Sequence, residues 1–128
     1  MKRLNARHAA AQAVAANANR PATSVIHDVT DARLIVFRIA PGQAVSPHQN
    51  ASTVILTVLA GAGVVSGGDG ECAVAPGDVI TYEPNEMHGM RAIDQELVLL
   101  ATITPRPGTR ASVTAEGTVS SGRRSSAT

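Results

Sequence analysis

Two similar segments in the middle of the chain constrain its fold more than any other feature. An Ala-Pro-Gly turn at residues 40–42 opens the first segment, and another at residues 75–77 opens the second. Each turn precedes a strand-like run and a single histidine, His48 in the first segment and His88 in the second. Proline fixes φ and glycine adopts positive φ, so both favour sharp turns. Two β segments of this kind can deliver their histidines to one pocket.

Short apolar runs separated by turn residues predict an all-β fold. Residues 32–40 alternate, with large apolar side chains on one face of a strand. Residues 53–59 and 97–103 are β-branched or leucine-rich runs without helix caps. Glycine and proline clusters stand between these runs. Many short strands at close spacing indicate a sandwich or a barrel.

The two ends of the chain differ in composition from its middle. The 128 residues suffice for one domain, which we expect at residues 21–105. Residues 1–20 are rich in alanine and predict one or two helical turns that depend on docking against the domain. Residues 106–128 are rich in Ser, Thr, Gly and Arg and predict a disordered tail, because they offer too little apolar surface to offset the entropy of ordering.

Charge and cysteine content limit the classes of function. The net charge of +1 conceals basic ends around an acidic middle, so the folded domain is not expected to bind nucleic acid. No stretch approaches the roughly 20 apolar residues of a membrane span. Cys72 is the single cysteine, and we expect a buried, inert thiol in a reducing compartment. A cytoplasmic location is the default expectation.

The apolar run at residues 97–100 would be hydrophobic on both faces of a strand. One face can fill a barrel interior, so the other face requires a cover. That cover is either the N-terminal segment or a second subunit, and we favour a sheet-to-sheet homodimer.

The glycines and histidines resemble the first motif of the cupin superfamily, whose double-stranded β-helix is a jelly-roll barrel. That motif contains a glycine, two histidines, a glutamate and a second glycine, in this order. Gly42, His48 and Gly61 stand at the expected spacing. Asn50 takes the place of the second histidine, and Val54 that of the glutamate.

The second cupin motif is also present in part. Gly77 and His88 keep the separation of the family pattern. Pro84 is displaced by one residue, Glu86 lies near the position of the family's glycine, and Ala92 stands at the terminal asparagine. The resemblance therefore implies a small single-domain cupin with an incomplete set of metal ligands.

Metal-binding cupins direct three histidines and a glutamate into the barrel. The resemblance implies that His48 and His88 are the central groups here, with Asn50 as a weak accessory ligand. Glu86 precedes His88 by two residues, and its carboxylate could complete a facial triad. The ion would be Fe, Mn, Ni or Zn. Without an ion, the two histidines would be a hydrogen-bonded pair left in the barrel mouth.

Three further residues are expected to line the pocket. Tyr82 could act as a donor, although strand alternation allows either Tyr82 or Glu83 to face inward, not both. Met90 would form a flexible apolar wall. Arg91 could meet an anionic ligand, and its alternative is a surface ion pair with Asp94.

These residues predict a protein that binds a small polar ligand or a loosely held divalent metal in the barrel mouth. The first alternative is a metal-dependent dioxygenase or isomerase that uses His48, His88 and Glu86. The second alternative is a structural or regulatory dimer with a vestigial pocket. Because cupins include both enzymes and binding modules, the sequence leaves open whether the chain is an enzyme.

Overall fold

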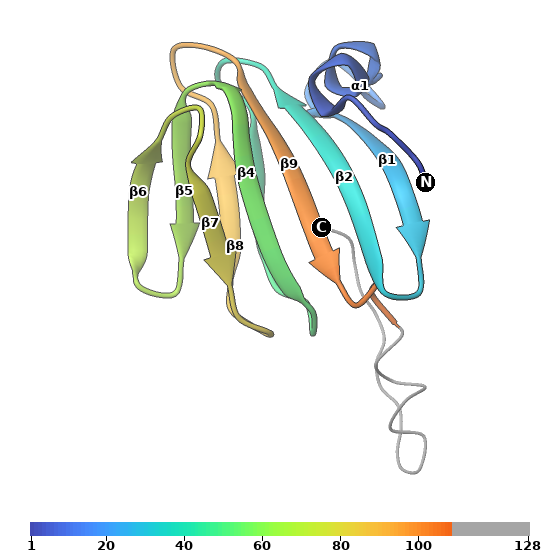
Figure 1. The fold of residues 1–128 in the computed structure, drawn as a ribbon. Coiled ribbons are helices and arrows are strands. Elements are labelled where there is room, and N and C mark those ends of the chain that lie inside the picture. The colour runs from blue at the N-terminus through green and yellow to red at the C-terminus, as the bar shows by residue number, and fades with distance from the viewer. Residues whose placement is uncertain (109–128) are drawn as a thin grey trace.

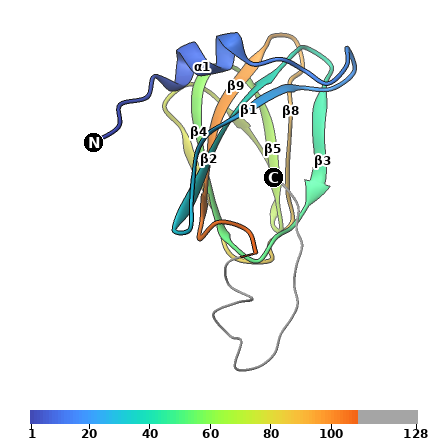
Figure 2. The ribbon, with the colours of Figure 1, turned by 90° about the vertical axis from the view of Figure 1, so that its right-hand side faces the viewer.

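The computed structural model describes residues 1–108, which form two antiparallel sheets and one short helix (Figure 1). The helix and strands follow one another as α1 (Ala6–Gln12), β1 (Ala22–Val29), β2 (Ala32–Ile39), β3 (Ala44–His48), β4 (Thr53–Gly61), β5 (Gly63–Gly67), β6 (Gly70–Val74), β7 (Val79–Tyr82), β8 (His88–Arg91) and β9 (Leu97–Thr104). The larger sheet has the order β1-β2-β9-β4-β7, and the smaller has the order β3-β8-β5-β6. The chain crosses repeatedly between the sheets, which confirms the predicted jelly-roll barrel (Figure 2).

Aliphatic side chains fill the space between the two sheets. The alternation predicted for residues 32–40 is confirmed, because β2 buries Ile35, Phe37 and Ile39. Strand β9 pairs with β2 on one side and β4 on the other, at the centre of the larger sheet. Each large apolar side chain that is fully buried stabilises the fold by roughly 1.5–3 kcal/mol. The chain thus builds its core almost without aromatic residues.

Both predicted Ala-Pro-Gly turns are present at equivalent places in the barrel. Gly42 has a φ of 85° and Gly77 a φ of 96°, in the left-handed region that favours glycine. The Gly42 amide donates to the Ala92 carbonyl, and the Gly77 amide donates to the Val58 carbonyl. Each turn therefore links the start of one strand to a distant part of the barrel.

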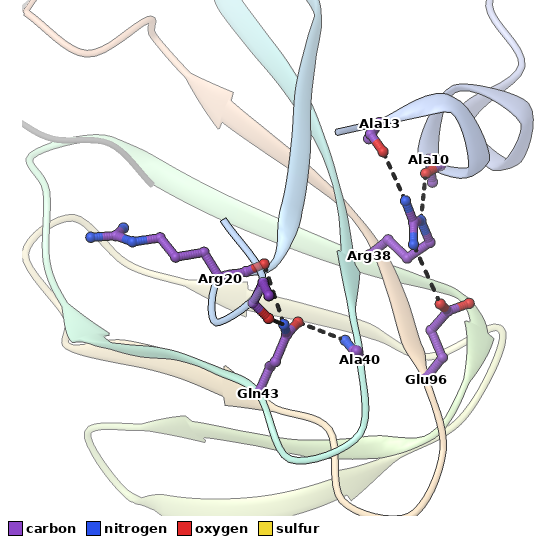
Figure 3. A network of polar contacts seen from close by, with 8 residues as sticks. Ala10, Ala13, Arg20, Arg38, Ala40, Gln43 and Glu96 are labelled. Atoms are coloured by element: carbon purple, nitrogen blue, oxygen red, sulfur yellow. Dashed lines mark hydrogen bonds and ion pairs between the residues drawn. The ribbon is translucent and has the colours of Figure 1, made fainter. Parts of the chain in front are cut away.

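Arg38 in the larger sheet and Gln43 in the turn between β2 and β3 hold the N-terminal extension against the barrel (Figure 3). Arg38 Nε donates to the Ala10 carbonyl at 3.0 Å, and Nη2 donates to the Ala13 carbonyl at 2.8 Å. Gln43 Nε2 donates to the carbonyls of Ala18 and Arg20. A helix of seven residues has little stability of its own. These hydrogen bonds therefore dock the N-terminal helix on the domain, as the prediction for residues 1–20 required.

The apolar run of β9 receives its cover partly from α1. Ala10 packs with Val36 and Val98, and Leu100 lies at the edge of the same cluster. The N-terminal segment, one of the two expected covers, is thus in place. The predicted tail beyond residue 108 lies outside the described residues. Within residues 1–108, no helix is long and apolar enough to cross a membrane.

Replacing Arg38 with methionine should release α1 from the sheet while keeping the aliphatic stem. Two hydrogen bonds from a charged group are lost, so we expect the free energy of unfolding to fall by about 1–3 kcal/mol. Amide hydrogen exchange should accelerate at residues 6–13. Arg33→Met is the matched control, because it breaks only an exposed ion pair with Asp28 and should cost less than about 1 kcal/mol. Equal losses in the two variants would contradict the role of Arg38.

Candidate functional site

The two predicted histidines lie opposite each other on neighbouring strands. His48 ends β3, His88 begins β8, and the antiparallel register pairs the two residues directly. Their ring centroids are 4.3 Å apart, with 60° between the ring planes. His88 is only 1% exposed and His48 is half-buried. The convergence predicted from the two similar segments is therefore present.

A backbone carbonyl holds each imidazole ring through Nδ1. His48 Nδ1 lies 2.9 Å from the Ser46 carbonyl oxygen, and His88 Nδ1 lies 3.1 Å from that of Glu86. A carbonyl oxygen can only accept, so Nδ1 must carry the proton. In a neutral ring the lone pair is then on Nε2. Both Nε2 atoms are buried without a hydrogen-bond partner among the described residues.

Asn50 adds a third buried nitrogen without a partner. Asn50 as a whole residue is 8% exposed. Its Oδ1 atom accepts a hydrogen bond from the Ser52 amide at 2.9 Å. This bond fixes the orientation of the amide, so Nδ2 is the atom left without a partner. An unsatisfied buried polar group costs roughly 1–3 kcal/mol, and a polar ligand or water usually accounts for it. Two of these three atoms belong to the paired histidine rings, and that pair marks the candidate binding site.

Burial favours the uncharged form of His88. Burial lowers the pKa of His88, and the nearby His48 lowers it further, whereas the bond to the Glu86 carbonyl and the Glu86 charge act in the opposite direction. A buried imidazolium would lose its hydration, so the neutral ring is favoured. His88 therefore offers a lone pair and not a positive charge.

Tyr82 closes one side of the pair. It is 3% exposed, and its ring centroid lies 4.9 Å from that of His88. Its hydroxyl donates to the Ser66 carbonyl at 2.8 Å, and burial raises the pKa of the phenol to about 12. Glu83 is exposed, as alternation required once Tyr82 faced inward. Met90 is buried in the same core.

Glu86 does not join the histidines in a ligand set. Its carboxylate accepts hydrogen bonds from the amides of Gly68 and Glu83, each at 3.1 Å. These two bonds lower the pKa of the carboxyl group. Within residues 1–108, no three His, Cys, Asp or Glu side chains are arranged to hold a metal ion. Glu86 instead supplies the backbone carbonyl that orients His88.

Two expectations near the pocket are wrong. Arg91 forms a surface ion pair with Glu71 at 2.7 Å, so the partner in its surface ion pair is not Asp94. Cys72 is exposed, not buried, because β6 is an edge strand of the smaller sheet. Both outcomes depend on the position of β6, which carries Glu71 and Cys72 and lies at the edge of the smaller sheet.

An open groove of about 820 Å³ adjoins the site on the side of β6. The β5–β6 hairpin and the loop between β7 and β8 line this groove, and Tyr82 and Glu86 belong to its wall. Sequence reasoning missed Ser46, Ser52 and Ser66, which bond to site residues. Ser46 and Ser66 contribute carbonyls and Ser52 an amide, so the identity of these side chains gave no signal for those bonds.

The fold and the enclosed histidine pair define a cupin-type barrel with a polar interior site. A family model described as the AraC-like ligand binding domain matches residues 34–126, and the chain belongs to this family. No curated protein matches the sequence.

Several solved structures share this fold. An RmlC-like cupin from Desulfovibrio desulfuricans is 26% identical, with a TM-score of 0.69 over 82% of this chain and 97% of that chain. A protein from Thermus thermophilus is 25% identical, with a TM-score of 0.69 over 76% of this chain and 94% of that one. A predicted oxalate decarboxylase from Thermotoga maritima is 22% identical, with a TM-score of 0.63 over 66% and 80% of the two chains, and shows the fold alone.

Replacing Glu86 with glutamine should destabilise the loop before His88 in a pH-dependent way. The folded state lowers the pKa of this carboxyl, so its stabilising contribution is present above the ordinary glutamate pKa and is lost as pH falls through the folded value. We expect a lower melting temperature for Glu86→Gln near neutral pH and convergence with wild type in acid.

Glu83→Gln is the control for this prediction. The Glu83 carboxylate is exposed and does not accept hydrogen bonds from the Gly68 and Glu83 amides, which bond to Glu86. Its melting temperature should follow wild type at every pH. A Glu86→Gln deficit of the same size at neutral and acid pH would contradict the assignment.

Proposed function

We propose that this chain binds a small polar ligand inside the barrel, beside His48 and His88, with Asn50 as an accessory group. The observation that carries this proposal is the set of three buried nitrogen atoms without partners. Burying them unpaired would cost several kcal/mol in total, at roughly 1–3 kcal/mol each. A ligand that bonds to them would recover that cost.

The polarity of these atoms favours an uncharged ligand with hydroxyl groups. The two Nε2 lone pairs accept hydrogen bonds, whereas the Asn50 NH₂ group donates. A hydroxyl can donate to an imidazole and accept from an amide. The buried polar residues within 1–108 are Asn50, Ser52 and His88, with no carboxylate or cationic side chain among them. A charged ligand would therefore lack a countercharge in the interior.

A loosely held divalent metal is the second candidate. Bonds from Nδ1 to backbone carbonyls are the usual way in which proteins orient a metal-binding imidazole. However, the full ligand set of metal-binding cupins does not fit this chain, because Asn50 and Val54 replace two ligands. Structural sites usually take four protein ligands and catalytic sites three. An ion held by His48 and His88 would therefore need water or a bound ligand to complete its coordination. With only two protein ligands, its binding would be weak.

The other predictions from sequence remain proposals. A dioxygenase or isomerase centre would require the Glu86 carboxylate to leave the amides of Gly68 and Glu83. A regulatory module with a vestigial pocket would need no ligand at all. The homodimer concerns another surface, the outer face of the larger sheet, and the cytoplasmic location stays a prediction.

Ligand binding can be tested by ¹⁵N NMR of the histidine side chains. We propose titration with neutral probes (glycerol, D-ribose and D-glucose) and with acetate as a charged comparison. At least one neutral probe should shift the Nε2 resonances of His48 and His88 in a saturable way, more than acetate does. His48→Ala should weaken that binding by roughly tenfold or more, the value of one lost hydrogen bond in a closed site.

His27→Ala is the control for this titration. His27 is half-buried on β1, in the larger sheet, whereas both site histidines belong to the smaller one. Binding of the same probe should be unchanged in this variant. Saturable shifts for acetate alone, or equal losses in the His27 and His48 variants, would contradict the proposal.

Metal binding can be tested with a variant that adds a metal-coordinating side chain to the site. Wild-type protein purified without chelators should contain little Fe, Mn, Ni or Zn and should take up added Zn²⁺ or Ni²⁺ weakly. Asn50→His restores the histidine of the first cupin motif and should tighten binding by roughly tenfold or more. His48→Ala in this background should abolish it. If neither wild type nor Asn50→His takes up any of the four metals, both the metal candidate and the metal-dependent enzyme are excluded.

A further inference from the structure

The groove beside β6 is an opening in the side of the barrel. Strand β6 ends the smaller sheet and β7 ends the larger one, and within residues 1–108 no ladder of hydrogen bonds joins these two strands. The groove that both strands line has a volume of about 820 Å³. Pockets that hold small molecules usually measure roughly 300–1,000 Å³. The opening is therefore wide enough to admit a small molecule.

Tyr82 separates this groove from the histidine pair. Its side chain belongs to the groove wall, and its ring centroid lies 4.9 Å from that of His88. A Cβ atom added at Gly67 would lie 3.2 Å from Tyr82 Cε1, so the ring packs directly against the backbone of β5. Neither His48 nor His88 belongs to the groove wall. The tyrosine ring thus reaches from β7 to β5 and closes the opening on its inner side.

A ligand cannot reach the two histidines while Tyr82 is in this position. The Nε2 atoms of both rings are buried, so part of the barrel must move before a ligand can bond to them. Local opening is most frequent where the fewest contacts are broken. Within residues 1–108 the Tyr82 hydroxyl has one hydrogen bond, to the Ser66 carbonyl. The groove also leaves space into which the ring can turn.

The barrel mouth, the other way to the histidines, is closed by bonds between two loops. Gln49 Nε2 donates to the Asn85 carbonyl, and the Asn85 amide donates to the Asn50 carbonyl at 2.7 Å. Opening the mouth would break both of these bonds, whereas turning the Tyr82 side chain breaks one. The side opening therefore requires the smaller rearrangement.

We propose that the groove is the entrance to the histidine site and that Tyr82 is its gate. The ring turns out into the groove, and a ligand passes through the space that the ring leaves. This inference rests on the proposed ligand site and adds its route of access.

The charge of the groove makes this entrance selective. Its wall contains Asp69, Glu71, Glu83 and Glu86 and no Lys, Arg or His. Arg91 pairs with Glu71, whereas the other three carboxylates have no ion pair within residues 1–108. A negative field at an opening lowers the local concentration of anions. The entrance thus disfavours anions, in agreement with the uncharged ligand inferred from the interior.

Chemical modification of the histidines in the full chain tests the gate without a ligand. Diethyl pyrocarbonate acylates imidazole nitrogens that have a free lone pair, so it reacts with His48 and His88 only while the site is open. Mass spectrometry of peptides gives the rate at each histidine, and the exposed His8 is the internal reference. Tyr82→Phe removes the bond to the Ser66 carbonyl and keeps the ring. Both site histidines should react about two- to tenfold faster in this variant, which corresponds to the loss of one hydrogen bond.

Two further variants are the controls for Tyr82→Phe. Gln49→Ala also removes one side-chain bond to a backbone carbonyl, but at the mouth, and it should leave the rates unchanged. Arg38→Met destabilises the fold away from the site. Unchanged rates in this variant would show that the reagent does not enter through global unfolding. Thermal unfolding should show that all three variants stay folded.

Blocking the groove should have the opposite effect. Cys72 is the single cysteine, is exposed and lines the groove. Fluorescein maleimide attached to its thiol should slow the modification of His88 severalfold. The same label on Val25→Cys, in a Cys72→Ser background, is the control. Val25 is 52% exposed on β1, at the opposite edge of the larger sheet from β7, so this label should not change the rate.

Faster reaction in Tyr82→Phe but not in Gln49→Ala, with slower reaction after labelling of Cys72, supports the gate. Acceleration in Gln49→Ala or Arg38→Met that equals or exceeds that in Tyr82→Phe would overturn it. Unchanged rates after labelling of Cys72 would also overturn it, as would a complete lack of reaction at both site histidines in wild type and Tyr82→Phe.

The gate and the ligand proposal can fail separately, because the reagent reports access and the NMR titration reports binding. A negative result for the gate with saturable shifts of the histidine Nε2 resonances would count against the entrance alone. A positive result for the gate without binding of any neutral probe would count against the ligand proposal alone.

Discussion

The direct pairing of His48 with His88 in the β3–β8 register is the constraint on which the site depends. Each ring donates a hydrogen bond from Nδ1 to the carbonyl oxygen of the residue two positions before it. Both Nε2 atoms are left buried without a partner. A shift of one residue in this register would turn one histidine to the other face of its strand. The turns, the strand order and the Glu86 contacts all serve to hold this pairing.

The fold could be predicted because its signals are local. Alternation at residues 32–40 fixes which side chains of β2 enter the core. Gly42 and Gly77 adopt positive φ at the two turns that the sequence marked. The histidine pair could be predicted as well, because two similar segments of a cupin barrel deliver equivalent positions to the interior.

The remainder of the site could not be predicted, because it depends on neighbours that are distant in sequence. Arg91 pairs with Glu71 across the smaller sheet, and Cys72 is exposed because its strand ends that sheet. Glu86 has the right spacing from His88 for a shared face, but two backbone amides capture its carboxylate. The spacing of residues along the chain does not show which partners will bond to a carboxylate, because the tertiary fold decides which groups come close to it.

The central claim is that the neutral form of each site histidine carries its proton on Nδ1, so that the Nε2 lone pair is left buried without a partner. The ¹⁵N chemical shifts of the imidazole nitrogens in the free protein near neutral pH measure this directly. The account predicts a protonated shift for Nδ1 and an unprotonated shift for Nε2 in both His48 and His88. An imidazolium pattern for His88, or a proton on Nε2 in the neutral form of either ring, would contradict it.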